Sequence, residues 1–257
     1  MLRLASGVCA VTALLLSGCQ APADEPVESR SLTTQALEKH YVEPGCQAEN
    51  CSEVKVSALT FPQSPELSEQ LQARLLKLAM GITEEGALPA RNWGDYARNF
   101  FALTQEDKGL LPDFMASEAV LKADVYAQHN DLLVIELNGY VYQAGQAHGL
   151  PMTEFMVIDE KLQRVVDAND MLLEGQQAAF QVVLSQVHQR WVAEMGHSGQ
   201  LAVSWPLSES LNIAPLETVW EVKYNVYELA PYVVGQPILT LPVEELDGIA
   251  KPRYIGR

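Results

Sequence analysis

The feature that most constrains the fold is a hairpin signal in the middle of the chain. Two runs rich in strand-forming residues, 120–128 and 132–142, are separated only by the short polar turn His129-Asn130-Asp131. A connection of this length returns the chain antiparallel to itself, because a parallel crossover needs many more residues. The sequence therefore predicts two adjacent antiparallel strands, around which the remaining elements must be arranged.

Shorter runs of the same kind lie on both sides of this hairpin. They cover residues 54–58, 155–158, 220–227 and 238–241. Apolar and polar residues alternate most regularly over 220–227, which is typical of a half-buried strand. Pro242 follows the last run and places it at the edge of a sheet, because proline cannot donate a hydrogen bond to a neighbouring strand.

Three segments have helical periodicity and interrupt the strands as blocks. They cover 65–78, about 93–104 and about 174–195, and Gly81 and Gly196 follow the first and the last of them. Ser64 precedes the first helix and is expected to cap it through its hydroxyl group. Strands joined by hairpins, with helices inserted between them, predict an α+β fold: a mainly antiparallel sheet with three main helices packed on it.

The N-terminus has the pattern of an export signal. Arg3 precedes an apolar stretch over 8–16, and Leu16-Ser17-Gly18-Cys19 matches the lipobox of bacterial lipoproteins. The stretch is shorter than the roughly 20 apolar residues of a membrane-spanning helix. We therefore expect residues 1–18 to be a signal peptide and Cys19 to carry lipid, which would be the chain's attachment to the membrane. The alternative is an ordinary secretory signal that ends at a cysteine by chance.

The segment after Cys19 is polar, contains prolines and has no periodicity. Residues 19–35 are therefore predicted to be a lipidated tether, followed by an N-terminal α+β part over 36–110 and a C-terminal α+β part over 111–257 that forms one compact unit with it. Gln20, rather than an aspartate, follows Cys19. By the sorting convention of Gram-negative bacteria this favours the periplasmic face of the outer membrane.

The charge of the chain restricts its partners. The full chain has a formal net charge of −16, which becomes −17 when residues 1–18, with one arginine and no acidic residue, are removed. Such a charge argues against binding to nucleic acid or to an anionic lipid surface. It is compatible with a basic protein partner, and equally with a surface whose charge serves solubility alone.

Two cysteines remain after export and lipidation. Cys46 and Cys51 flank the short stretch Gln-Ala-Glu-Asn, and an oxidising compartment would favour a disulfide between them. A metal site would need two further ligands close by, and only His40 is near in the sequence. The disulfide is the preferred interpretation, and no cofactor or metal is expected.

The sequence contains no catalytic signature. A nucleophile elbow, a zinc-protease helix, a phosphate loop and a dinucleotide fingerprint are all absent, and the five histidines have no metal-ligand spacing. One unusual segment, 140–151, ends a strand with glycines around His148. This histidine either hydrogen-bonds the backbone of a bent strand end or is presented on a surface loop for recognition.

This segment resembles the Gly-Gly-Ala-His-Pro element of the family that includes the extracellular part of the RsiV anti-sigma factor, a lysozyme receptor. Related regions precede the catalytic domain of some peptidoglycan deacetylases. A second similar element, Tyr-Glu-Ile-x-Pro-Tyr-x-x-Gly, matches residues 227–235, and residues 242–246 match the closing turn that follows it. A weaker match covers 59–78. In order and spacing, the resemblance extends over about 54–248.

The chain also departs from the family. Gln146 replaces the second glycine of the first element, and Gly149-Leu150 separates His148 from Pro151. The cytoplasmic sigma-binding segment and the membrane helix are absent, so the resemblance implies no anti-sigma role.

What the resemblance does imply is the fold and a capacity to bind a protein. We expect a non-catalytic envelope lipoprotein that binds a lysozyme-like, cell-wall-active protein or peptidoglycan, with His148, Tyr227 and Tyr232 as the candidate contacts. The alternatives are an envelope enzyme that modifies cell-wall polymer through His148 and a nearby acid, and a structural or assembly lipoprotein.

Overall fold

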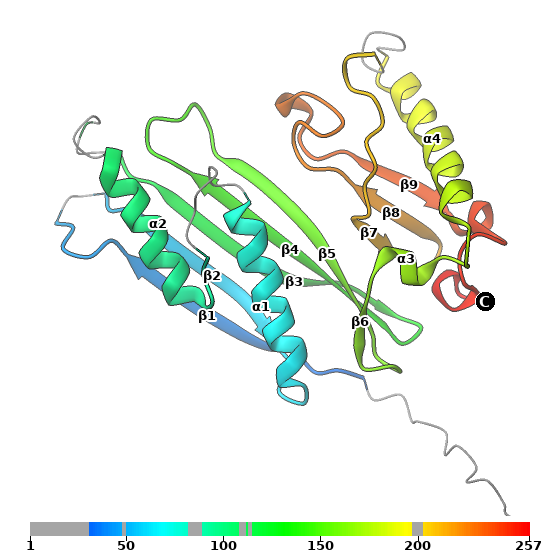
Figure 1. Cartoon of the computed structure of the whole chain (residues 1–257), viewed down its shortest axis with the longest axis horizontal. Helices are drawn as coiled ribbons and strands as arrows, with labels where there is room; N and C mark the ends of the chain where they lie inside the picture. The colour runs from blue at the N-terminus through cyan, green and yellow to red at the C-terminus, as the bar shows by residue number, and fades with distance from the viewer. Residues whose placement is uncertain (1–30, 48–49, 82–88, 108–111, 113–114, 197–202) are drawn as a thin grey trace, which may run out of the picture.

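The computed structural model describes residues 31–257 except 48–49, 82–88, 108–111, 113–114 and 197–202, and these residues form two sheets (Figure 1). All neighbouring strands of the larger sheet are antiparallel except β2 and β3. The predicted α+β fold with a mainly antiparallel sheet is therefore confirmed. In spatial order the six strands are β1 (Gln35–Val42), β2 (Glu53–Thr60), β3 (Glu118–His129), β4 (Leu132–Tyr142), β5 (Leu150–Asp159) and β6 (Arg164–Val166).

The predicted hairpin is the pair β3 and β4. His129 is opposite Leu132, so the turn consists of Asn130 and Asp131, both with positive φ, 49° and 59°. Asparagine and aspartate tolerate this left-handed backbone better than most residues, and two such residues in succession match the twist of the flanking strands. The turn chemistry therefore explains why the chain reverses at this point.

The parallel pair β2 and β3 results from the helices inserted between these strands. α1 (Pro65–Met80) and α2 (Trp93–Asp107) lie between the two strands in the chain and cover the same face of the sheet (Figure 1). The leucines whose spacing predicted α1 lie on its buried face, as expected. The buried side chains of α1 are Leu67, Leu71, Leu75, Leu76, Leu78 and Ala79.

The start of α1 differs from the prediction in one detail. The helix begins at Pro65 as expected, but the Ser64 hydroxyl makes no capping hydrogen bond. Ser68, one turn into the helix, binds the incoming chain instead: its Oγ accepts a hydrogen bond of 2.8 Å from the Phe61 backbone N–H. The hydroxyl group that fixes the approach to the helix therefore belongs to Ser68, within the helix, and not to Ser64.

The smaller sheet contains β7 (Ile213–Pro215), β8 (Val219–Lys223) and β9 (Ile238–Pro242), in that order and all antiparallel. β9 is an edge strand, as Pro242 predicts. α4 (Gln177–Glu194) packs on β9, while α3 (Ala168–Met171) is a single turn. Of the three main helices, α1 and α2 therefore cover the large sheet and α4 covers the small one (Figure 1). The 3-10 helices are η1 (Tyr232–Val234), η2 (Val243–Leu246) and η3 (Pro252–Ile255).

The predicted strand over 220–227 is four residues too long. β8 ends at Lys223, although Tyr224 and Val226 remain buried and the alternation of burial continues. The side chain of Asn225 hydrogen-bonds β5 of the large sheet, and Tyr227 has a left-handed backbone with φ of 68°. The alternation thus reflects a buried irregular segment, in which tertiary contacts replace strand pairing.

The two sheets bury separate hydrophobic clusters. One cluster lies between α1, α2 and the large sheet, and the other surrounds Trp220 between α4, the small sheet and the C-terminal segment. Leu132 and Val157, from β4 and β5 of the large sheet, belong to the second cluster. The large sheet therefore contributes to both clusters, and this joins the two halves of the fold.

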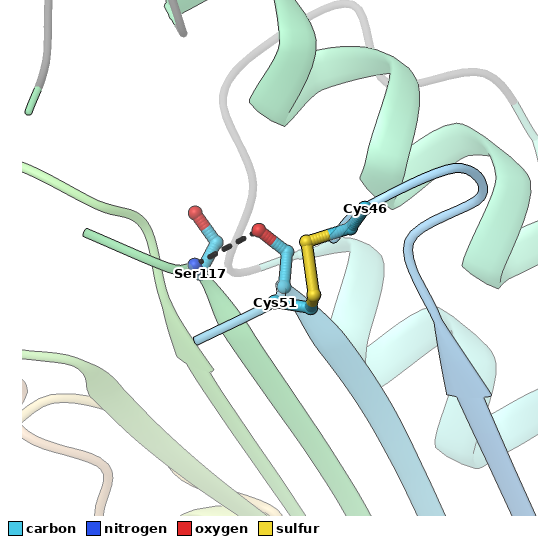
Figure 2. Close-up of a disulfide and its surroundings, with 4 residues drawn as sticks. Cys46, Cys51 and Ser117 are labelled. Atoms are coloured by element: carbon cyan, nitrogen blue, oxygen red, sulfur yellow. Dashed lines mark hydrogen bonds between the residues drawn. A yellow bond between two sulfur atoms is a disulfide. The ribbon is translucent and has the colours of Figure 1, made fainter. Parts of the chain in front are cut away.

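The loop between β1 and β2 is closed by the predicted disulfide. Cys46 and Cys51 are bonded, with their Cα atoms 5.9 Å apart (Figure 2). Next to this bridge, the Ser117 backbone N–H donates to Ser52 Oγ at 3.1 Å, and Ser117 O accepts from the Glu53 N–H. So short a loop contributes only about 2 kcal/mol by the chain-entropy model. The disulfide is a local constraint beside the start of β3.

The segment before β1 already contacts the folded body. Leu32, within the range predicted as tether, is buried, and its N–H donates a 2.6 Å hydrogen bond to the Glu160 carboxylate. Cys19 and the predicted signal peptide lie outside the described residues. Within the described ranges, no helix has the length and apolar character required to cross a membrane.

Candidate functional site

The three residues proposed for binding come from different elements and meet in space. His148 lies in the loop between β4 and β5, Tyr227 follows the end of β8, and Tyr232 begins η1. The rings of His148 and Tyr232 are stacked, with centroids 3.8 Å apart and an angle of 20° between their planes. The Tyr227 ring centroid lies 6.5 Å from that of His148 and 5.7 Å from that of Tyr232.

Hydrogen bonds hold this arrangement together. The Tyr232 hydroxyl donates to the Gly149 carbonyl at 2.9 Å, and His148 Nδ1 lies 3.1 Å from the same carbonyl. The second ring nitrogen, Nε2, lies 3.3 Å from the Tyr227 hydroxyl. If Nδ1 carries the proton, it donates to the carbonyl and Nε2 accepts from Tyr227. The two interpretations of His148, backbone bonding and surface recognition, are therefore not exclusive.

Gly149 explains one of the glycines in the unusual segment. A Cβ atom at this position would overlap the ring of Tyr140, which lies directly over the glycine backbone. The residue therefore has to be glycine for the loop to pass this close to Tyr140. At the other end of the loop, Ser117 Oγ accepts a 2.9 Å hydrogen bond from the Ala144 N–H. These contacts position His148 without using its side chain.

Tyr227 is the most exposed ring of the group. Its side chain is 48% exposed and its φ is 68°, a left-handed conformation that is uncommon for a bulky residue. The backbone strain is supported by neighbours, since the Asn225 N–H is bound by Glu228 and the Glu228 N–H by Asn225 O. Unfavourable backbone of this kind is concentrated at functional sites. The Tyr227 ring is exposed on the face that the alternation over 220–227 assigns to polar residues.

Sequence reasoning missed two members of this surface. Trp205 stacks on Tyr227, with centroids 6.5 Å apart and planes at 27°, and Val233 beside Tyr232 is 90% exposed. Trp205 lies in an irregular segment without periodicity, so only its residue type could have indicated a role. We call Trp205, Tyr227, Tyr232, Val233 and His148 the aromatic patch.

The contacts of His148 within the aromatic patch define its chemical surroundings. Each contact of His148 described above is with a tyrosine or a backbone carbonyl, whereas a histidine acting as general base is commonly oriented by a carboxylate. Among the described residues, no group of three or more histidine, cysteine, aspartate or glutamate side chains is placed to hold a metal ion. The patch offers partly exposed rings in a fixed arrangement.

The known proteins to which the chain is similar are solved structures. No protein-family model matches the chain. No curated protein matches it either. A crystal structure of a DUF3298 family protein from Pseudomonas aeruginosa PAO1 is similar, with 29% sequence identity and a TM-score of 0.72, over 88% of this chain and 98% of that one. The structural neighbours of the present chain are DUF3298 proteins.

A second neighbour has a lower sequence identity. A member of the DUF3298 family from Bacteroides fragilis is 18% identical, with a TM-score of 0.65, over 88% of this chain and 97% of that one. At this identity the likeness shows the fold alone. Both likenesses extend over almost the whole of the solved chains and over 88% of this chain.

Proposed function

We propose that this chain is a non-catalytic, lipid-anchored binding protein of the cell envelope, and that it recognises a basic, lysozyme-like protein through the aromatic patch. The observation that carries the proposal is the convergence of His148, Tyr227 and Tyr232 with Trp205 on one partly exposed surface. The resemblance of residues 140–151 and 227–235 to a lysozyme-receptor family supports the choice of partner.

The composition of the patch suits a protein interface. Tyrosine and tryptophan are the residues most enriched among those that dominate binding energy, because they bury a large area at little cost in side-chain entropy. The stacking and hydrogen bonds of Tyr232 and His148 already fix their rings in the free protein. A partner would therefore lose less free energy in ordering this surface than in ordering mobile side chains.

The charge of the chain suits a basic partner. A formal charge of −16 attracts a cationic protein at long range and raises the rate of encounter. Charge alone would give weak adhesion that disappears in salt, since the Debye length is about 8 Å at physiological ionic strength. The proposal therefore requires a contribution from the rings that persists in salt.

Titration calorimetry with lysozyme, on the chain without its signal peptide and lipid, tests this function. We expect binding to persist at about 150 mM salt and Tyr227→Ala to weaken it about 5- to 150-fold, as for the loss of 1–3 kcal/mol at an interface anchor. Leu162→Ala is the matched control, because Leu162 is 52% exposed against 48% for Tyr227 and lies in the turn after β5.

The result that would overturn the proposal is equally specific. Binding that vanishes at that salt concentration would show that the negative charge acts alone. Binding that persists in salt but is equally strong in Tyr227→Ala and Leu162→Ala would show that Tyr227 is not an anchor of the interface. Circular dichroism of both variants establishes that the fold is intact. Sedimentation with insoluble peptidoglycan, in parallel, separates a protein partner from the cell-wall polymer.

A further inference from the structure

A cleft of about 680 Å³ lies beside the aromatic patch. Its walls come from β5, from α3 and the residue before it, from segments 208–213 and 225–228, and from Arg74 of α1. The cleft therefore lies between the large sheet and the segments that lead into and out of the small sheet. Its volume falls within the range of about 300–1,000 Å³ that is typical of ligand sites.

The lining of the cleft has two chemical parts. Apolar side chains contribute from both halves of the fold, among them Phe155, Val157 and Met171. Four carboxylates, Glu154, Asp167, Glu209 and Glu228, also line the cleft, and Arg74 is the only cation among the lining residues. The lining thus combines an apolar surface with three net negative charges.

Two of the carboxylates already form ion pairs within the chain. Arg74 forms ion pairs with Glu154 at 2.5 Å and with Asp167 at 3.2 Å. Glu228 accepts a hydrogen bond from the Asn225 N–H on the segment after β8, and Glu209 is exposed on the segment before β7. The excess of negative charge is therefore located on the two segments that belong to the small sheet.

These same two segments carry the aromatic patch. Glu228 directly follows Tyr227, and Glu209 lies four residues after Trp205, the ring that stacks on Tyr227. A protein seated on the aromatic patch would therefore place its neighbouring residues at the mouth of the cleft. The patch and the cleft are continuous through short stretches of backbone.

We propose that the cleft receives a lysine or arginine side chain of the basic protein that binds the aromatic patch, an inference that rests on the proposed function. Such a side chain has an aliphatic stem and a cationic head. The stem packs on Phe155 and Met171, and the head meets the carboxylates of Glu209 and Glu228. These exposed carboxylates would repel an acidic side chain and would give a neutral one no electrostatic attraction, so the cleft favours basic proteins.

Two charge-matched double variants test the inference. Glu209→Gln with Glu228→Gln removes the two carboxylates that the cationic head is proposed to meet, and the amide oxygen that replaces the Glu228 carboxylate can still accept from the Asn225 N–H. Glu69→Gln with Glu194→Gln removes two exposed carboxylates from α1 and α4. Both variants raise the net charge equally. At about 150 mM salt we expect the cleft variant to bind lysozyme about five- to thirtyfold more weakly than the control variant.

A third variant changes the shape of the cleft without changing its charge. Asn169 is exposed on α3 and lines the cleft, so a large ring in Asn169→Trp should obstruct entry while the fold is kept. We expect a loss of lysozyme affinity of similar size. Trilysine provides a direct probe, and it should bind the control variant more tightly than either the cleft variant or Asn169→Trp.

The outcomes separate this inference from the proposed function. If Tyr227→Ala weakens lysozyme binding but the cleft and control variants bind lysozyme and trilysine equally, the cleft is empty in the complex and the inference is wrong. If trilysine binding follows the cleft variants but lysozyme does not bind in salt, the cleft takes a cationic side chain and the proposed partner is wrong. Equal binding of both probes by all variants overturns both proposals.

Discussion

At the scale of single residues, the ion pair of Arg253 and Asp159 is expected to contribute strongly to stability. Asp159 is fully buried, and its two oxygens accept from Arg253 Nε at 2.6 Å and Nη2 at 2.5 Å. Arg253→Ala should lower the free energy of unfolding by about 3 kcal/mol, because it leaves a buried carboxylate without its counter-charge. Arg257→Ala is the control, since Arg257 and its partner Asp247 are both exposed and such pairs contribute below about 1 kcal/mol. Urea denaturation that finds equal losses would contradict this assignment.

The buried histidine of α4 gives a prediction about pH. His188 packs against Trp191, and its Nε2 has no hydrogen-bond partner among the described residues. Burial lowers the pKa of His188 below the usual value of about 6.5, so the unfolded chain takes up this proton before the folded protein does. The contribution of neutral His188 to the free energy of unfolding is therefore fully present above about pH 6.5, the usual histidine pKa, which applies to the unfolded chain. This contribution is lost as the pH falls from there through the lower pKa of the folded protein. Urea midpoints at pH 7.5 and 5.5 should differ less in His188→Leu than in the wild type, and equal differences would exclude His188 as the cause.

At the scale of elements, the exposed edge of β5 is closed by side chains in place of a strand. β6 pairs only with the last three residues of β5. Beyond them, Asn212 accepts from the Phe155 N–H at 2.7 Å and donates to the Thr153 carbonyl at 2.9 Å, while Asn225 accepts from the Thr153 N–H at 2.7 Å. An open sheet edge is a template for unwanted pairing, so these two asparagines protect it.

Replacement of Asn212 should have a measurable effect on stability and on hydrogen exchange in β5. Asn212→Ala should lower the free energy of unfolding by about 1–3 kcal/mol, as expected when polar groups lose their partners. Amide hydrogen exchange should accelerate at Phe155, whose N–H loses its acceptor, and remain slow in β3, where both neighbours are strands. Asn169→Ala, on the exposed turn α3, is the control. Unchanged exchange at Phe155 would show that the asparagine does not act as a surrogate strand.

The sequence predicts the elements that bury a regular face and misses those that do not. The leucines of α1 and the polar turn of the hairpin carry their signals locally, so α1, β3 and β4 could be predicted. β1 was missed because it is an edge strand with largely exposed residues, including Glu38, Lys39 and His40, and has no apolar face to recognise. The predicted strand at 220–227 was too long because a contact with a distant sheet, through Asn225, decides where β8 ends.

In the candidate site, too, local sequence signals could be predicted and contacts between distant segments could not. The resemblance to a known family indicated His148, Tyr227 and Tyr232, and the disulfide followed from the spacing of two cysteines. Neither kind of signal could indicate that Trp205 stacks on Tyr227, because the two residues meet through backbone turns with no repeating pattern. The cleft could not be predicted either, since its walls come from segments that are distant in the chain.

At the scale of the whole molecule, β5 runs between the point where the N-terminal segment joins the body and the aromatic patch. Its first residue, Leu150, follows His148 and Gly149 of the patch, and its last, Asp159, precedes Glu160, which binds the backbone of Leu32. A strand of ten residues spans about 30 Å. Leu32, near the start of the described chain, therefore contacts the body at the end of β5 opposite the aromatic patch. Our proposal of a lipid at Cys19 is compatible with a patch that is separated from the N-terminal segment by the length of this strand.

This arrangement predicts that anchoring and binding are separable. We propose that Cys19 carries the lipid; wild-type protein should then incorporate a palmitate analogue and sediment with membranes, whereas Cys19→Ser should do neither. Because the tether and the patch are at opposite ends of β5, the processed Cys19→Ser chain should bind lysozyme with the affinity of the soluble wild-type body. Equal labelling of both proteins would show that residues 16–19 are not a lipobox. Weaker binding by Cys19→Ser would contradict the prediction that anchoring and binding are separable.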